Sequence, residues 1–357
     1  MSAPPFDFVV IGSTPLARLL AGLLAGQHRR KVAFVGESQA GYRLSRSIDL
    51  SIAPITRPES WFMLEEGLAE TLKLLRPVTG RAWSRVDPIL FADEAGAIEA
   101  LAHMRHMAQG YRIAAEPAPP SLLGAGRAGV ILRDAVRLNR PALEPGLDAW
   151  LEQNGVARLV PERIGVAFDG SALLVAGGEE IHATQTILAD NDAILAFLPL
   201  PQWPVLLRRR AYSSILTTPT QPLAAAIMLE ISSGVTLLQQ PEGGIAAIGP
   251  GDLAAFSGRL HTLLGRERQV EQAGQTAFSA LAVADGAPAV GRVAGTGANI
   301  VAGMGNVGAF LAPALARWIA GTARPHEAEW FEARLVSRTA RGTDVTEFAP
   351  GFSEGIA

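Results

Sequence analysis

The chain has 357 residues, a length that corresponds to about two domains. Hydrophobic residues make up 48% of it and charged residues 18%, which is enough apolar material for a large core and excludes a disordered protein. The net charge of -3 argues against a general attraction to nucleic acid or to anionic membranes. The absence of cysteine excludes disulfides, thiolate metal sites and a cysteine nucleophile. The most apolar early run, at 16–26, is about half as long as a membrane span, so we expect a soluble cytoplasmic protein.

The N-terminal segment has the pattern of a strand, a tight turn, a helix and a second strand. An apolar run at 6–11 predicts a strand buried on both faces, and leucines at helical spacing predict a helix that starts at Pro15. A second buried strand is expected at 31–36, followed by Glu37. This order is typical of a dinucleotide-binding unit, in which backbone amides at the helix N-terminus hold a pyrophosphate. The turn reads G-x-T-x-x-A, with Thr14 in place of the second glycine, so from the turn alone a unit without a ligand remains an equal alternative.

The rest of the chain carries further patterns in a defined order. They are PILFA at 88–92, a helix expected at 93–109 with a strand at 111–114, VRLNRPALEPGLDAWLEQN at 136–154, three short strands of a β-meander at 163–168, 172–175 and 182–189, a hairpin at 235–249, DGAPAVG at 285–291, and GMGNVG at 303–308 before a helix with Ala312 and Pro313.

This order resembles the D-amino acid oxidase family of FAD-dependent oxidoreductases, which includes glycine and sarcosine oxidases, from about residue 7 to residue 323. The resemblance implies an α/β fold: an FAD-binding Rossmann-like domain of the glutathione reductase type with an interleaved antiparallel-sheet substrate domain. The FAD-binding domain would comprise 1–57, 136–200 and 283–325, and the substrate domain 58–135 and 201–282. Residues 326–357 would form a C-terminal tail, expected as a helix packed on its own chain, with an arm clasping a partner subunit as the alternative.

The resemblance also implies where FAD would bind. The adenine and pyrophosphate would lie at the first turn and strand tip, and the isoalloxazine would lie at the second glycine loop, whose helix N-terminus suits the negative charge of reduced flavin. The expected cofactor-binding residues are Gly12, Ser13, Thr14, Pro15, Leu16, Ala17, Glu37, Ser38, Arg43 (in preference to Arg46), Arg163, Ile164, Gly303, Met304, Gly305, Asn306, Val307 and Gly308. Because cysteine is absent and Met304 stands where many family members have histidine, we expect noncovalent FAD.

Candidate catalytic residues follow from the same resemblance. The family removes a hydride from the carbon that bears the nitrogen, and an arginine usually holds the substrate carboxylate. The arginine that often precedes D-G-x-P is replaced here by SALA at 279–282. Strand alternation would put Arg208 and Arg210 on one face and Arg209 on the other, so we predict Arg210 and Tyr212 at the substrate, with a solvated charge run as the alternative. We expect no metal site, and we interpret His103 and His106 as helix-surface residues.

Two functions remain open at this point. The first is an FAD-dependent amine or amino acid dehydrogenase or oxidase with a small-molecule substrate. The second is a flavin-binding or degenerate subunit of a larger complex. The second would be favoured by the departures from the family pattern at Thr14, at 279–282, and at Asp190 and Asn191, where the meander normally exits through A-x-G.

Overall fold

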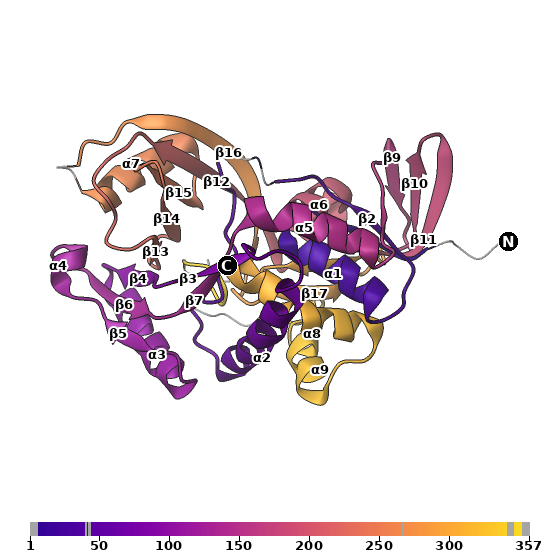
Figure 1. Ribbon diagram of the computed structural model, residues 1–357, viewed down its shortest axis with the longest axis horizontal. Helices are drawn as coiled ribbons and strands as arrows, with labels where there is room; N and C mark the ends of the chain where they lie inside the picture. Colours follow the sequence, from indigo (N-terminus) through magenta and orange to yellow (C-terminus); the bar gives the residue numbers. More distant parts are fainter. Residues whose placement is uncertain (1–5, 40, 42–43, 266–267, 341–345, 352–357) are drawn as a thin grey trace.

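The computed structural model describes residues 6–39, 41, 44–265, 268–340 and 346–351. Two eight-stranded sheets form its framework, and helices cover their faces (Figure 1). The first sheet has the strand order β17 (Ala289–Arg292), β18 (Asn299–Ala302), β11 (Glu179–Leu188), β1 (Phe6–Ile11), β2 (Val32–Val35) and β8 (Ala157–Arg158). Strands β11, β1 and β2 are parallel neighbours, so their carboxyl ends meet at one edge.

A β-meander extends the first sheet. It consists of β9 (Arg163–Val166), β10 (Ala172–Ala176) and β11, paired antiparallel, and it projects from the body at the right of Figure 1. Helix α1 (Pro15–Gly26) packs against both α5 (Arg140–Gln153) and α8 (Gly308–Ala320). Pro15 occupies the first turn of α1 as expected. The helix is buried on all sides from Pro15 to Ala25, and not only along the leucine stripe that predicts it, because α5 and α8 pack on it as well as the sheet.

The second sheet has the strand order β16 (Gln272–Val283), β12 (Leu207–Thr217), β15 (Ile245–Pro250), β14 (Val235–Gln239), β13 (Ile227–Glu230), β4 (Ile89–Ala92), β6 (Ala128–Leu132) and β5 (Ala115–Pro117). Its pairs are antiparallel except β13 with β4 in the described chain. Strands β14 and β15 form the expected hairpin.

The remaining elements connect or cover the two sheets. They are α2 (Pro58–Leu75), β3 (Trp83–Val86), α3 (Ala95–Gly110), α4 (Pro120–Leu123), β7 (Ala135–Leu138), α6 (Asn191–Phe197), η1 (Leu200–Gln202), α7 (Leu253–Leu264), η2 (Gly305–Val307) and α9 (Pro325–Glu332). Helix α9 packs on α2 and α8 of its own chain, as the simpler interpretation of the tail predicts. Among the described residues no helix combines the length and apolar character needed to cross a bilayer.

The predicted α/β class is confirmed, with one mixed sheet whose central strands are parallel and a second, mainly antiparallel sheet. Two local predictions are wrong. The strand expected at 111–114 starts at Ala115, because the chain first turns through Arg112 in the left-handed region, with φ of 60°. The segment 136–154 opens with strand β7, and its helix begins only at Arg140, ahead of a proline in the first turn. The domain boundaries stay a prediction.

Candidate functional site

A cavity of about 530 Å³ lies where the two sheets face each other. Its walls come from the turn after β1, the exit of β11, the loop before α8, and strands β12, β15 and β16 of the second sheet. Residues 349–351 of the C-terminal tail also line it. This volume is within the range of small-molecule sites.

In the first glycine turn, at the N-terminus of α1, the amides of Gly12, Ser13 and Ala17 are hydrogen-bonded within the chain. The Thr14 hydroxyl caps the helix by accepting a 3.3 Å hydrogen bond from the Ala17 amide. The amide of Ser13 donates to a carboxylate oxygen of Asp190 at 2.5 Å. An extra carbon on Gly12 would lie 2.9 Å from this carboxylate oxygen. The carboxylate therefore occupies the position in which a helix N-terminus binds an anion.

Asp190 reaches this turn because of the sheet topology. It directly follows Ala189 at the carboxyl end of β11, and the neighbouring strand β1 leads into Gly12. Its other carboxylate oxygen accepts a 2.9 Å hydrogen bond from the Ala193 amide, which caps α6. Desolvation raises the pKa of Asp190 above its ordinary value, and the hydrogen bonds from the backbone amides oppose that shift.

The tip of β2 is tied to the same turn. The Ser13 hydroxyl accepts a 3.0 Å hydrogen bond from the amide of Glu37, whose side chain is exposed. The fully buried guanidinium of Arg18 donates to the carbonyls of Ser13 at 2.7 Å and of Glu37 at 3.0 Å. The Ser38 hydroxyl donates to Glu144 at 3.0 Å. This arrangement fixes the turn relative to β2 and α5.

The second glycine loop, before α8, is in contact with the C-terminal tail. The Asn306 amide donates a 3.0 Å hydrogen bond to the carbonyl of Phe348, and the Glu347 amide donates one of 2.8 Å to Gly286. Gly305 has a φ of +46°, and a Cβ on it would collide with the Phe348 carbonyl. The tail therefore reaches the loop at the position that the sequence predicts for the isoalloxazine.

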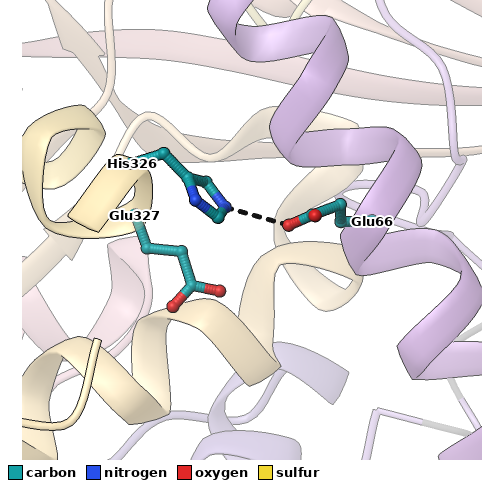
Figure 2. A group of neighbouring side chains, drawn as sticks. All are labelled: Glu66, His326 and Glu327. Carbon is teal, nitrogen blue, oxygen red and sulfur yellow. Dashed lines mark hydrogen bonds and ion pairs between the residues drawn. The ribbon is translucent and has the colours of Figure 1, made fainter. Parts of the chain in front are cut away.

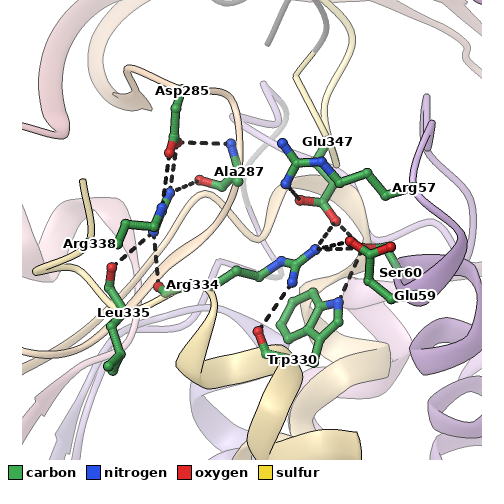
Figure 3. A network of polar contacts seen from close by, with 10 residues as sticks. All are labelled: Arg57, Glu59, Ser60, Asp285, Ala287, Trp330, Arg334, Leu335, Arg338 and Glu347. Carbon is green, nitrogen blue, oxygen red and sulfur yellow. Dashed lines mark hydrogen bonds and ion pairs between the residues drawn. The ribbon is translucent and has the colours of Figure 1, made fainter. Parts of the chain in front are cut away.

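Figure 3 shows how two arginines hold the tail in this position. Arg334 donates to Glu347 at 2.8 Å, and both side chains are almost completely buried. Arg57 donates to the other oxygen of Glu347 at 3.0 Å. Further along, Arg338 forms a two-pronged ion pair with Asp285 of the DGAPAVG segment, with distances of 2.9 and 2.7 Å. Ion pairs thus attach the segment after α9 to Arg57, which precedes α2, and to Asp285 of the DGAPAVG segment.

The wall contributed by the second sheet carries the cationic and aromatic groups. Arg208 and Arg210 line the cavity, whereas Arg209 lies on the other face and donates to Ser279 at 2.9 Å. Burial raises the pKa of Tyr212 above its ordinary value, partly offset by the charge of Arg210, so its hydroxyl is a neutral donor. Near the mouth, Arg46 lies over the ring of Phe278 at 5.4 Å and pairs with Asp192 at 3.3 Å.

The predicted site residues fall into three groups. Those that line the cavity are Thr14, Leu16, Gly303, Met304, Gly305, Asn306, Gly308, Arg210 and Tyr212. A second group does not line the cavity and lies in the first turn, in α1, at the tip of β2, in the meander or inside the second loop. This group consists of Gly12, Ser13, Pro15, Ala17, Glu37, Ser38, Arg163, Ile164 and Val307. Arg43 lies outside the described residues. The sequence did not predict the contacts of Asp190 or of 346–351. A signal for Asp190 was present, because the exit of the meander reads Ala189-Asp190-Asn191 and lacks the glycine of the A-x-G pattern.

One group of carboxylates and histidine lies apart from the cavity, between α2 and α9 (Figure 2). The His326 ring lies 2.9 Å from a carboxylate oxygen of Glu66. Glu327 lies nearby, but Arg317 donates hydrogen bonds to both of its carboxylate oxygens. The Nε donates to Oε2 at 3.0 Å and the Nη2 donates to Oε1 at 2.6 Å. An arginine therefore neutralises the carboxylate that a metal ion would need, and the group is a set of ion pairs that joins α2, α8 and α9.

Solved structures of known proteins share the fold of this chain. Glycine oxidase from Geobacillus kaustophilus is 15% identical, with a TM-score of 0.65 over 99% of this chain and 100% of that chain. L-amino acid deaminase from Proteus myxofaciens is 13% identical, with a TM-score of 0.66 over 92% and 93%. L-proline dehydrogenase from P. horikoshii is 13% identical, with a TM-score of 0.67 over 92% and 96%.

The chain has the fold of these amino acid oxidoreductases. The resemblance to the D-amino acid oxidase family is thereby confirmed at the level of fold. No family model matches the chain, and no curated protein matches its sequence.

The two glycine loops lie where FAD would need them, but one hydrogen-bond donor that FAD would use is already bonded to Asp190. Both glycine loops of the fold border one cavity, together with the aromatic and cationic wall. At the first loop, however, the Ser13 amide, one of those that would hold a pyrophosphate, donates to the Asp190 carboxylate. A pyrophosphate and this carboxylate cannot accept the same hydrogen bond at the same time.

Proposed function

We propose that the protein is an FAD-dependent oxidoreductase that removes a hydride from the C–N bond of an amine or amino acid. The observation that carries this proposal is the meeting of two glycine loops from opposite ends of the chain, 12–17 and 303–308, at one cavity. A long ligand with a phosphate-bearing end and a ring end would account for both loops. The names of the similar structures, which include iminodiacetate oxidase, all refer to compounds with nitrogen one carbon away from a carboxylate.

The residues of the chain would have distinct tasks in this reaction. A flavin, when bound, supplies the hydride acceptor. Arg210 would pair with the substrate carboxylate, and the neutral hydroxyl of Tyr212 would donate a hydrogen bond to it. The N-terminus of α8 would stabilise negative charge at the ring end of the cavity. The two strands β12 and β16 would keep the substrate at the face of the cavity opposite the first sheet.

The experiment is a spectral one. Protein purified with added FAD should show bound-flavin absorbance, and denaturation should release the flavin into solution, because we infer noncovalent attachment. Anaerobic addition of glycine, sarcosine, L-proline and iminodiacetate, each paired with an amine that lacks the carboxylate, should bleach the absorbance for at least one carboxylated member. Colour without bleaching by any amine would contradict the proposed reaction and would favour the flavin-binding subunit. The cytoplasmic location expected from the sequence stays a prediction.

A further inference from the structure

The carboxylate of Asp190 lies at the N-terminus of a twelve-residue helix whose anion position would otherwise be open to a ligand. Two backbone amides, those of Ser13 and Ala193, donate to it. The amide of Ser13 belongs to the turn of the βαβ unit, and the amides of that turn are the donors that such a unit offers to a diphosphate. Asp190 is therefore in direct competition with any diphosphate for the hydrogen bond of the Ser13 amide.

Charge strengthens this competition. A diphosphate that approached the turn would meet the negative charge of Asp190, and Asp192 lines the same cavity. The nearest buried cation, Arg18, lies beneath the turn, where it pairs with Asp148 at 3.0 Å and donates to two carbonyls. Arg46 at the mouth pairs with Asp192. The cations described around the turn are thus engaged with acidic partners, and they do not offset the charge of Asp190.

We propose that Asp190 is the residue that sets the affinity of the first loop for a diphosphate, by acting as an internal anion that the ligand must displace. This inference rests on the proposed function, because it identifies the diphosphate with the pyrophosphate of the dinucleotide. Withdrawal of Asp190 frees the Ser13 amide and removes the negative charge from the loop. It also breaks the hydrogen bond between Asp190 and Ser13, so the loop binds a diphosphate more weakly than one that is open from the start.

The chain offers a matched pair of variants to test this. Asp190→Asn removes the charge, while the amide oxygen can still cap α6 through the Ala193 amide. Asp192→Asn makes the same charge change in the same cavity, on a half-exposed side chain whose ion pair is with Arg46. Asp190→Ser also keeps a capping group and serves if Asp190→Asn does not fold.

The measurement is calorimetric titration of the full chain with ADP, which carries the diphosphate without the isoalloxazine, followed by titration with FAD. We expect Asp190→Asn to bind ADP and FAD about tenfold or more tightly than the unaltered chain. Asp192→Asn should change either affinity by less than about threefold, because Asp192 is half-exposed and its charge is already paired with Arg46. Equal ADP affinity in all three, or no ADP binding by any folded Asp190 variant, overturns the inference. Tighter ADP binding in Asp190→Asn, combined with a flavin that no amine reduces, upholds the inference and overturns the proposed function.

Discussion

The amide of Asn306 donates a 3.0 Å hydrogen bond to the carbonyl of Phe348, and this contact joins the second glycine loop to the C-terminal tail. It requires the backbone of the tail to approach Gly305 so closely that a side chain there has no space. Phe348 is fully buried and stacks on Trp330 at 6.1 Å, so the tail is packed as core. The first prediction follows from this relationship.

Gly305→Ala should destabilise the fold beyond the ordinary cost of replacing a left-handed glycine. The new methyl group would collide with the Phe348 carbonyl and would strain a backbone with φ of +46°, which together should cost about 2–4 kcal/mol of unfolding free energy. Gly321→Ala is the matched control, because Gly321 has a φ of +76° and open space around it, so only the strain of about 1 kcal/mol remains. Urea unfolding followed by tryptophan fluorescence measures both. Equal losses in the two variants would show that the tail does not press on the loop.

The buried pair of Arg334 and Glu347 should contribute strongly to stability. Arg334→Met leaves a buried carboxylate with fewer partners, and we expect a loss of about 3 kcal/mol, at the lower end for buried pairs because Arg57 still pairs with Glu347. Arg85→Met, which breaks the exposed pair with Asp134, should change stability by less than about 0.5 kcal/mol. Urea unfolding of both variants tests this, and a similar small change in each would contradict the prediction.

Arg210 should affect substrate binding if the proposed function holds. We expect Arg210→Gln to raise KM for a carboxylated substrate by about 10- to 100-fold, because a charge-assisted hydrogen bond is lost. Arg209→Gln is the control, since Arg209 is adjacent in sequence but lies on the opposite face of β12. The test is to measure KM for both variants by steady-state kinetics, with the carboxylated amine that bleaches the flavin absorbance most strongly as substrate. An unchanged KM in Arg210→Gln would remove this residue from the substrate site.

Asp190 should also give stability a distinctive dependence on pH. Its pKa in the folded chain is raised, so the folded state holds the proton to a higher pH than the unfolded state does. Its stabilising contribution is therefore present in acid and is lost as pH rises through the folded pKa. Relative to the unaltered chain, Asp190→Asn should become more stable as pH rises above the ordinary carboxyl pKa of about 4, with a slope of at most about 1.4 kcal/mol per pH unit.

Asp169→Asn provides a control of opposite sign. Hydrogen bonds from Ser171 lower the pKa of Asp169, so its contribution is present above its ordinary pKa and is lost as pH falls. Relative to the unaltered chain, this variant should therefore become more stable as pH falls. Urea unfolding at several pH values measures both variants. A stability difference for Asp190→Asn that does not vary with pH would refute the assigned direction.

The elements of the fold could be predicted where local pattern decides the structure. The apolar run at 6–11 and the leucines of α1 gave the first strand and helix, because a buried strand and an amphipathic helix have different hydrophobic periods. The glycine turns were located by the spacing of their motifs, 12–17 and 303–308, each of which comes between a strand and a helix. The expected strand at 111–114 failed because Arg112 adopts a left-handed backbone that no local residue signal marks.

The candidate site was predictable in part. Gly303, Met304 and Gly305 line the cavity as their motif predicts, and the alternation of β12 correctly separates Arg210 from Arg209. The contact between Asp190 and Ser13 spans 177 residues and depends on β11 and β1 being neighbours, which is a fact of topology. The position of Phe348 at the second loop likewise depends on packing after α9, where the sequence offers no periodicity. Long-range contacts of this kind lie beyond a single sequence.

Gly305 bears on how flavoproteins are recognised in genomes. A glycine at such a position indicates that some group approaches the backbone closely, but it does not indicate which group. In this chain the group that approaches Gly305 is a backbone carbonyl of the same polypeptide. A search that counts such glycines as a cofactor signature would score this loop in full, so the identity of the neighbour has to be established before the signature is given chemical meaning.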